Sequence, residues 1–128
     1  MTLQPGNGSD SASLEYSFKY NPPMDHNVAE RNLKEAKQIL DNAGIVFLLF
    51  SGACLGAVRD SAFIPWDDDI DILSVMGIND LTEERLLAVV NTFKENGYFV
   101  KKLNGSYSRT FSMIKDYVRI GWDADYIV

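Results

Sequence analysis

The apolar residues between positions 27 and 43 follow the spacing of an amphipathic helix. They recur every three or four positions, which gives a helix one buried stripe, at Leu33, Ala36, Leu40 and Ala43. Asn42-Ala43-Gly44 then supplies a C-terminal stop signal. The pattern therefore predicts a helix from about Asn27 to Ala43.

A second helix is predicted between residues 80 and 96. Asn79 or Asp80 is the expected N-cap, and two glutamates follow in the first turn, where acidic side chains favour a helix start. Asn96-Gly97 marks its end. The stripe that should be buried consists of Leu86, Val89, Val90 and Phe93.

Strands are predicted between and after these helices. Residues 45–50 form a continuous apolar run, typical of a strand that is covered on both faces, and a small-residue turn and a short helix over 54–58 follow. Residues 69–72 alternate between polar and apolar side chains and begin a strand that is expected to end near Val75. Three further strand-like runs cover residues 98–103, 106–114 and 117–126, and Asn104-Gly105 is a hairpin signal between the first two.

Residues 1–24 are rich in Gly, Ser, Asn and Pro, a composition that buries too little apolar area to order itself. They are expected to form a flexible N-terminal tail. The alternation of Tyr16, Phe18 and Tyr20 offers an alternative, a short edge strand.

The order of these elements predicts an α/β or α+β domain over residues 25–128, in which helices flank a small mixed sheet. A chain of 128 residues has the size of one domain. It stops inside the apolar run Tyr126-Ile127-Val128, which fits either a terminal strand or a core that is incomplete at its C-terminus.

Composition narrows the function classes. The net charge of −6 argues against nucleic acid as a stable partner, although a bound metal would still allow a nucleotide substrate. One cysteine and one histidine leave neither an internal disulfide nor a Cys/His zinc set. No run is long enough to span a membrane and the N-terminus lacks the layout of a signal peptide, so a cytoplasmic protein is expected.

The densest chemistry lies in residues 65–72, Pro-Trp-Asp-Asp-Asp-Ile-Asp-Ile, which hold four carboxylates within five positions. Asp69 and Asp71 alternate with isoleucines, so on a strand both carboxylates project from the same face. Clustered like charges destabilise the compact state unless a cation neutralises them, and Mg²⁺ takes oxygen ligands. The pattern predicts a metal site at Asp69 and Asp71; the alternative is a solvated acidic turn before an ordinary strand.

The preceding segment suits phosphoryl or nucleotidyl transfer. The turn Ser51-Gly52-Ala53 lets backbone N–H groups approach phosphate oxygens. Mg²⁺ or Mn²⁺ held on the neighbouring strand would orient those phosphates. A third carboxylate is expected to bind a second ion or to accept a proton from the attacking hydroxyl. Either Asp123 or Asp125 of the last predicted strand could supply this carboxylate. The alternative is that the last strand is a solvated edge strand.

Two blocks of sequence together resemble the LicD and fukutin-related phosphotransferases, a family of the nucleotidyltransferase-fold superfamily. They are Ser-Gly-Ala-Cys-Leu-Gly-Ala-Val-Arg at 51–59 and Phe-Ile-Pro-Trp-Asp-Asp-Asp-Ile-Asp-Ile at 63–72. The resemblance is specific over about residues 33–75 and general beyond them. It implies a nucleotidyltransferase-like core and Mg²⁺-dependent transfer of a phospho-alcohol, such as phosphocholine or a polyol phosphate. The donor would be CDP-linked and the acceptor a glycan hydroxyl.

The resemblance also implies roles for single residues. Asp69 and Asp71 would ligate the metal, and Ser51 and Gly52 would lie in the turn that approaches the donor phosphates. Arg59 would either clamp a phosphate or pair with the acidic loop. Trp66 would either stack on a base or ring or shape the loop.

The chain departs from the family pattern in two respects. It has Ala53 where the family usually has threonine, and family members are typically longer. Two other functions therefore stay open: transfer of a nucleoside monophosphate from an NTP to a protein, small molecule or RNA, and a non-catalytic or truncated binding module of the same fold. For a fragment of a eukaryotic homologue, the expected compartment is the Golgi.

Overall fold

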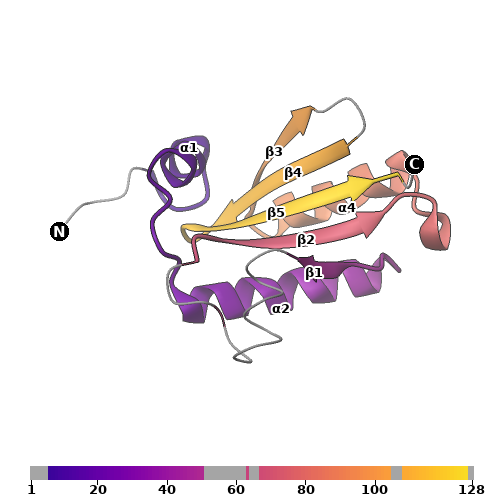
Figure 1. Cartoon of the computed structure of the whole chain (residues 1–128), viewed down its shortest axis with the longest axis horizontal. Helices are drawn as coiled ribbons and strands as arrows, with labels where there is room; N and C mark the ends of the chain where they lie inside the picture. Colours follow the sequence, from indigo (N-terminus) through magenta and orange to yellow (C-terminus); the bar gives the residue numbers. More distant parts are fainter. Residues whose placement is uncertain (1–5, 51–62, 64–66, 105–107, 127–128) are drawn as a thin grey trace.

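Figure 1 shows the computed structural model, an α+β fold in which helices flank a five-stranded mixed sheet, as predicted. The structure describes residues 6–50, 63, 67–104 and 108–126. In chain order its elements are α1 (Ser11–Tyr20), α2 (His26–Asn42), β1 (Leu48–Phe50), β2 (Asp69–Val75), η1 (Ile78–Asp80), α4 (Glu83–Glu95), β3 (Phe99–Asn104), β4 (Ser108–Lys115) and β5 (Val118–Asp125).

The sheet has the strand order β1-β2-β5-β4-β3. Neighbouring strands are antiparallel except β2 and β5, which run parallel in the register Asp69↔Arg119 through Val75↔Asp125. Parallel neighbours require a crossover connection, which here contains α4 and the β3–β4 hairpin. The topology therefore places residues 69–75 directly beside residues 119–125. The predicted hairpin is present, although residues 105–107 of its turn lie outside the described residues.

One face of the sheet packs against α2 and α4 and forms the main hydrophobic core (Figure 1). In β5 the alternate residues Val118, Ile120, Trp122 and Ala124 are all buried. Trp122 also donates from its Nε1 to Ser74 Oγ at 3.0 Å, so its one polar group is satisfied inside the core. This packing leaves the alternate residues of β2 and β5 on the opposite face of the sheet.

The two predicted helices are confirmed as α2 and α4, with one correction. The N-cap of α4 is Thr82, whose Oγ1 accepts from Arg85 N at 3.3 Å, whereas Asn79 and Asp80 belong to the separate turn η1. Asn79 and Asp80 both have positive φ, so their backbone does not continue into the helix. The predicted buried stripe of α4 is correct. Among the described residues, no helix is both long enough and apolar enough to cross a membrane.

The strand predicted over residues 45–50 is shorter than expected and is not covered on both faces. Only Leu48–Phe50 form a strand, and β1 lies at the edge of the sheet, where it pairs with β2 alone. Leu49 packs partly against the main core, while Leu48 is 60% exposed. A continuous apolar run does not reveal whether one or two faces will be covered.

Residues 11–20 form a helix, where the composition predicted a flexible tail and the alternation of aromatic residues an edge strand. Asp10 caps the helix by accepting from Ser13 N at 2.8 Å, and Asn21 ends it in the left-handed conformation. Leu14 is 1% exposed but lies outside the main core, because α1 packs against β4 on the opposite face of the sheet. One buried leucine in a polar segment is too weak a signal for composition to detect.

Candidate active site

The parallel pairing of β2 and β5 brings four predicted acidic residues onto one face of the sheet. Asp69 and Asp71 project from β2 on the side opposite to its buried isoleucines. Asp123 and Asp125 project from β5 on the same side, because residues in register on parallel strands face the same way. We call the surface formed by these four residues the acidic face.

Asp71 lies over the backbone of β5 at Gly121. The two residues are in register, and a Cβ placed on Gly121 would come within 2.9 Å of Asp71 Oδ1. The absence of a side chain at 121 therefore gives the Asp71 carboxylate its place. Burial raises the pKa of Asp71 to about 7, and the charge of Asp69 adds to the effect. Arg119 opposes this rise but does not cancel it.

Asp123 lies closer to this pair than Asp125 does. It is in register with Leu73, two residues beyond Asp71, and its charge contributes to the raised pKa of Asp71. Thr110 Oγ1 donates to Asp123 Oδ1 at 2.5 Å and holds that carboxylate in place. Asp125 lies two residues farther along β5, about 7 Å beyond Asp123. Its Oδ1 is enclosed and has no hydrogen-bond partner among the described residues, and burial raises the pKa of Asp125.

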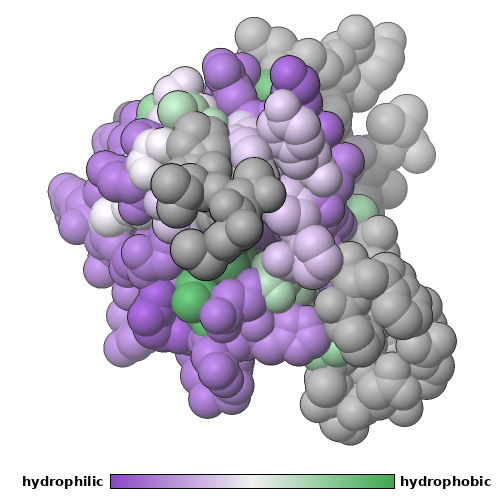
Figure 2. Space-filling view, turned by 90° about the vertical axis from the view of Figure 1, so that its left-hand side faces the viewer, coloured by the Kyte–Doolittle hydropathy of each residue, from purple (hydrophilic) through white to green (hydrophobic). Residues whose placement is uncertain are grey.

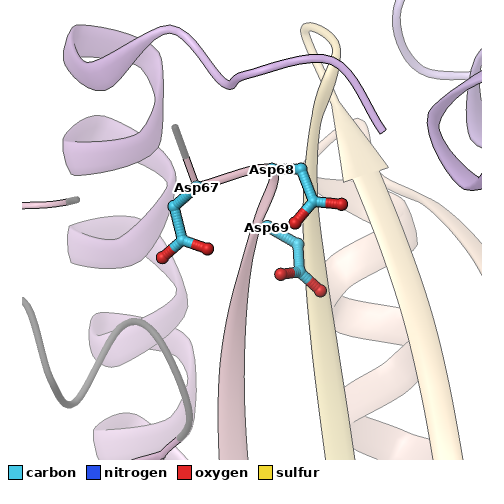
Figure 3. Close-up of side chains that lie close together, drawn as sticks. All are labelled: Asp67, Asp68 and Asp69. Carbon is cyan, nitrogen blue, oxygen red and sulfur yellow. The ribbon is translucent and has the colours of Figure 1, made fainter. Parts of the chain in front are cut away.

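Three consecutive aspartates gather where the chain enters β2. Figure 3 shows Asp67, Asp68 and Asp69 there, with Asp68 and Asp69 beside β5. One carboxylate oxygen from each residue lies within 4.8 Å of the other two. Burial raises the pKa of Asp67, and the charge of Asp68 adds to it. Asp67 Oδ2 is enclosed without a hydrogen-bond partner among the described residues.

Arg119 is the cation of this cluster. Its Nη2 lies 3.3 Å from Asp68 Oδ2 and 3.3 Å from Asp69 Oδ2, and its side chain is 8% exposed. Even so, the pKa of Asp69 is raised, because the effect of burial exceeds the opposing effect of Arg119. One guanidinium therefore does not neutralise the carboxylates around it.

The acidic face fits an oxygen-ligated divalent cation. Asp69 and Asp71 sit side by side on one strand, both partly buried, and burial is the main cause that raises the pKa of each. Carboxylates in such a setting are favoured in their charged form by Mg²⁺ or Mn²⁺. On this face Asp69 and Asp71 are placed to hold the ion, with Asp123 as the next carboxylate, and Asp67 and Asp68 bring two further carboxylates close to Asp69.

Four of the predicted site residues cannot be placed. Ser51, Gly52, Arg59 and Trp66 all lie outside the described residues, as does the predicted short helix at 54–58. Their expected contacts with donor phosphate or base remain predictions.

Sequence reasoning missed three residues that contact the acidic face: Thr110, Arg119 and Gly121. The alternation of β5 carried a signal for two of them, since it places Arg119 and Gly121 on the same side as Asp123. Their contacts with β2 depend on the parallel pairing, which no local pattern reveals.

Comparison with protein families agrees with this geometry. The model of the LicD/FKTN/FKRP nucleotidyltransferase domain matches residues 44–124. The chain belongs to the LicD family. The match to the LicD domain begins before β1 and ends at residue 124, one residue before the end of β5, so it takes in Asp69, Asp71 and Asp123 of the acidic face. It leaves out α1 and α2.

Individual relatives agree with the LicD assignment. An uncharacterized protein of Rickettsia prowazekii is 35% identical over 83 residues, which is 65% of this chain and 28% of that protein. The ribitol 5-phosphate transferase FKRP of human and of mouse is 30% identical over 63 residues, 49% of this chain and 13% of FKRP. The chain therefore matches less than a third of the length of these relatives.

Proposed function

We propose that this LicD domain transfers a phospho-alcohol, such as phosphocholine or a polyol phosphate, from a CDP-linked donor to a glycan hydroxyl, with Mg²⁺ or Mn²⁺ as cofactor. The observation that carries the proposal is the acidic face, where Asp69 and Asp71 lie beside Asp123 on a parallel strand pair. Membership of the LicD family and similarity to a ribitol 5-phosphate transferase support this class of reaction.

In the proposed reaction the acceptor hydroxyl attacks the phosphorus that carries the alcohol. A new bond forms between the acceptor oxygen and phosphorus, the bond to the CMP oxygen breaks, and CMP leaves. When bound, the metal offsets the negative charge that grows on the phosphate oxygens. Asp69 and Asp71 hold the metal from β2.

Asp123 is proposed to accept the proton of the acceptor hydroxyl. It lies nearer to Asp71 than Asp125 does, and the Thr110 hydroxyl fixes one of its oxygens. The second Asp123 oxygen stays available for the proton. Ser51 and Gly52 are proposed to approach the donor phosphates, Arg59 to pair with them and Trp66 to stack on the base.

The test is release of CMP from CDP-choline and CDP-ribitol in the presence of Mg²⁺ and candidate glycan acceptors. Asp69→Asn and Asp71→Asn should each lower the rate at least a hundredfold, because both remove metal ligands. Asp41→Asn is the matched control: it removes an exposed carboxylate on α2, which pairs only with Lys37 among the described residues.

Two results would contradict the proposal. CMP release that survives both Asp69→Asn and Asp71→Asn would show that the acidic face does not hold the metal. Release of pyrophosphate from CTP or ATP, with no reaction of the CDP-alcohols, would favour nucleoside monophosphate transfer instead.

A further inference from the structure

Helix α1 lies outside the LicD match, yet it contacts Arg119, the residue that pairs with Asp68 and Asp69. Figure 1 shows α1 at the end of the sheet where β2 and β5 begin. Ile114 of β4 is buried but, like Leu14 of α1, lies outside the main core. The sheet face that carries the carboxylates is thus covered by α1 at one end. Figure 2 faces this end and shows a largely hydrophilic surface with only a small apolar patch.

Arg119 is held between α1 and the acidic cluster. On one side the Phe18 ring centroid lies 4.3 Å from Arg119 Cζ, and Arg119 Nη1 reaches Ser17 Oγ at 3.5 Å. On the other side Nη2 lies 3.3 Å from both Asp68 and Asp69. The guanidinium is more than nine-tenths buried, so its orientation is set by these contacts.

The segment before α1 is tied to the turn that precedes Arg119. Tyr117 N donates to Gly8 O at 2.9 Å and Tyr117 Oη donates to Gly6 O at 3.0 Å. Asp116 N donates to Ser9 Oγ at 3.2 Å. Residues 6–20 therefore contact the start of β5 twice, at its turn and at its first outward-facing side chain.

We infer that Arg119 is a positioning residue for the metal ligand Asp69, and that α1 holds Arg119 in place through Phe18. The inference rests on the proposed function, because it treats Asp69 as a ligand. The bond to Arg119 involves Asp69 Oδ2, which leaves Oδ1 for a metal. Carboxylates that ligate metals are commonly fixed by such an outer partner, and removing the partner weakens metal binding about 10- to 100-fold.

The planar fork of arginine matters more than its charge in this role. Nη2 bridges two carboxylates while Nη1 points back to α1, a geometry that the single ammonium of lysine does not reproduce. Arg119→Lys keeps the positive charge and therefore its repulsion of the metal. A change in metal binding in this variant thus reports the lost positioning of Asp69. Phe18→Ala leaves Arg119 intact and removes only its support from α1.

The experiment measures binding of Mn²⁺ alone to the full chain, by electron paramagnetic resonance of the free ion. Water-proton relaxation then counts the waters on the bound ion. Arg119→Lys should weaken binding about tenfold and add about one bound water, because Asp69 no longer stays in place. Phe18→Ala should weaken binding about two- to fivefold in the same direction.

Tyr20→Ala is the matched control on the same helix. Tyr20 is exposed and contacts Tyr16 and Lys19, not Arg119, so binding and water count should stay those of the unmodified protein. A variant that merely destabilised the fold would change the fraction of folded protein but not the number of waters on its bound ion.

The outcomes separate this inference from the proposed function. If Asp71→Asn abolishes Mn²⁺ binding while Arg119→Lys and Phe18→Ala bind Mn²⁺ with unchanged affinity and water count, the positioning role is refuted and the metal site stands. If the unmodified protein binds no Mn²⁺, or Asp71→Asn binds it equally well, the metal site and the positioning role both fail. Should Arg119→Lys fail to fold, Phe18→Ala still decides the question.

Discussion

The contact between Gly121 and Asp71 shows how much a single residue contributes to this site. Asp71 occupies the space where any other residue at 121 would place its Cβ, and the atom it would meet is the Asp71 carboxylate oxygen itself. That carboxylate lies over the backbone of β5 in register with Gly121, so a methyl group at 121 would have to displace it. Glycine at 121 thus contributes to the proposed metal site although it supplies no ligand.

Gly121→Ala should therefore weaken Mn²⁺ binding about tenfold or more, because the new methyl group displaces Asp71 Oδ1. Titration with Mn²⁺ would measure the change. Gly97→Ala serves as control: its φ of +92° makes alanine strained there, at about 1–2 kcal/mol, but the residue lies in the turn before β3. Equal metal affinities in the two variants would rule out the proposed placement of Asp71.

The raised pKa of Asp71 also makes stability depend on pH. Because the folded-state pKa of about 7 exceeds the unfolded value of 3.8, the folded protein binds the proton more tightly. This contribution is complete below pH 4 and disappears as the pH rises through 7. Asp67 and Asp69 shift in the same direction.

In EDTA, the free energy of unfolding should accordingly be larger at pH 5.5 than at pH 8. The part due to Asp71 is about 1–2 kcal/mol, after a discount for solvent screening of a half-exposed carboxyl. Urea unfolding at the two pH values would measure it. Asp71→Asn should reduce the difference, and a variant that retained all of it would contradict the assignment.

Among the secondary-structure elements, α1 and β1 departed most from expectation. Helix α1 depends on an Asp10 cap and on a few buried side chains, notably Leu14 and Ser17, within an otherwise polar segment. Strand β1 is strongly apolar, yet it lies at the edge of the sheet. In both, packing against the rest of the chain outweighed the local pattern.

Leu14→Ala should release α1 without unfolding the sheet. Since Leu14 lies outside the main core, its truncation should weaken the packing of α1 on the sheet by about 2–4 kcal/mol and leave the main core unchanged. Hydrogen exchange would then show early exchange of the α1 amides while β4 and β5 stay protected.

Leu40→Ala provides the comparison, because Leu40 is fully buried in the main core. It should lower the protection of all elements together. A uniform loss of protection in Leu14→Ala as well would mean that α1 belongs to the same cooperative unit as the sheet.

For the molecule as a whole, the acidic face opposes folding unless a cation is bound. The chain carries a net charge of −6, and several of its carboxylates gather on one sheet face around Arg119. A divalent cation that binds only the folded state shifts unfolding by mass action. If the proposed function holds, metal and CDP-linked donor should stabilise the protein together, since the metal would also contact the donor phosphates.

Mn²⁺ at about 100 times its dissociation constant should raise the free energy of unfolding by about 2.7 kcal/mol. Thermal unfolding with Mn²⁺, CDP-ribitol and both together would measure the effect, with Ca²⁺ and CMP as comparison ligands. Asp71→Asn should lose most of the shift with metal. A shift of equal size in that variant would place the metal elsewhere on the protein.

The sequence by itself determined the elements with strong periodicity, namely α2, α4, β2 and the strands after α4. It also determined the pairing of Asp69 with Asp71, because residues two apart on a strand must share a face. The family resemblance rested on contiguous blocks around residues 51–72, which a sequence displays directly.

Only the tertiary structure decided which distant residues complete the site. The parallel pairing of β2 with β5 brought Arg119, Gly121 and Asp123 beside the two aspartates, and α1 came to cover Arg119. Strand pairing depends on how the whole chain buries its apolar faces, so it leaves no local mark at residue 119 or 121. The two proposed ligands lie on one strand, whereas the residues that surround them are brought together by the fold.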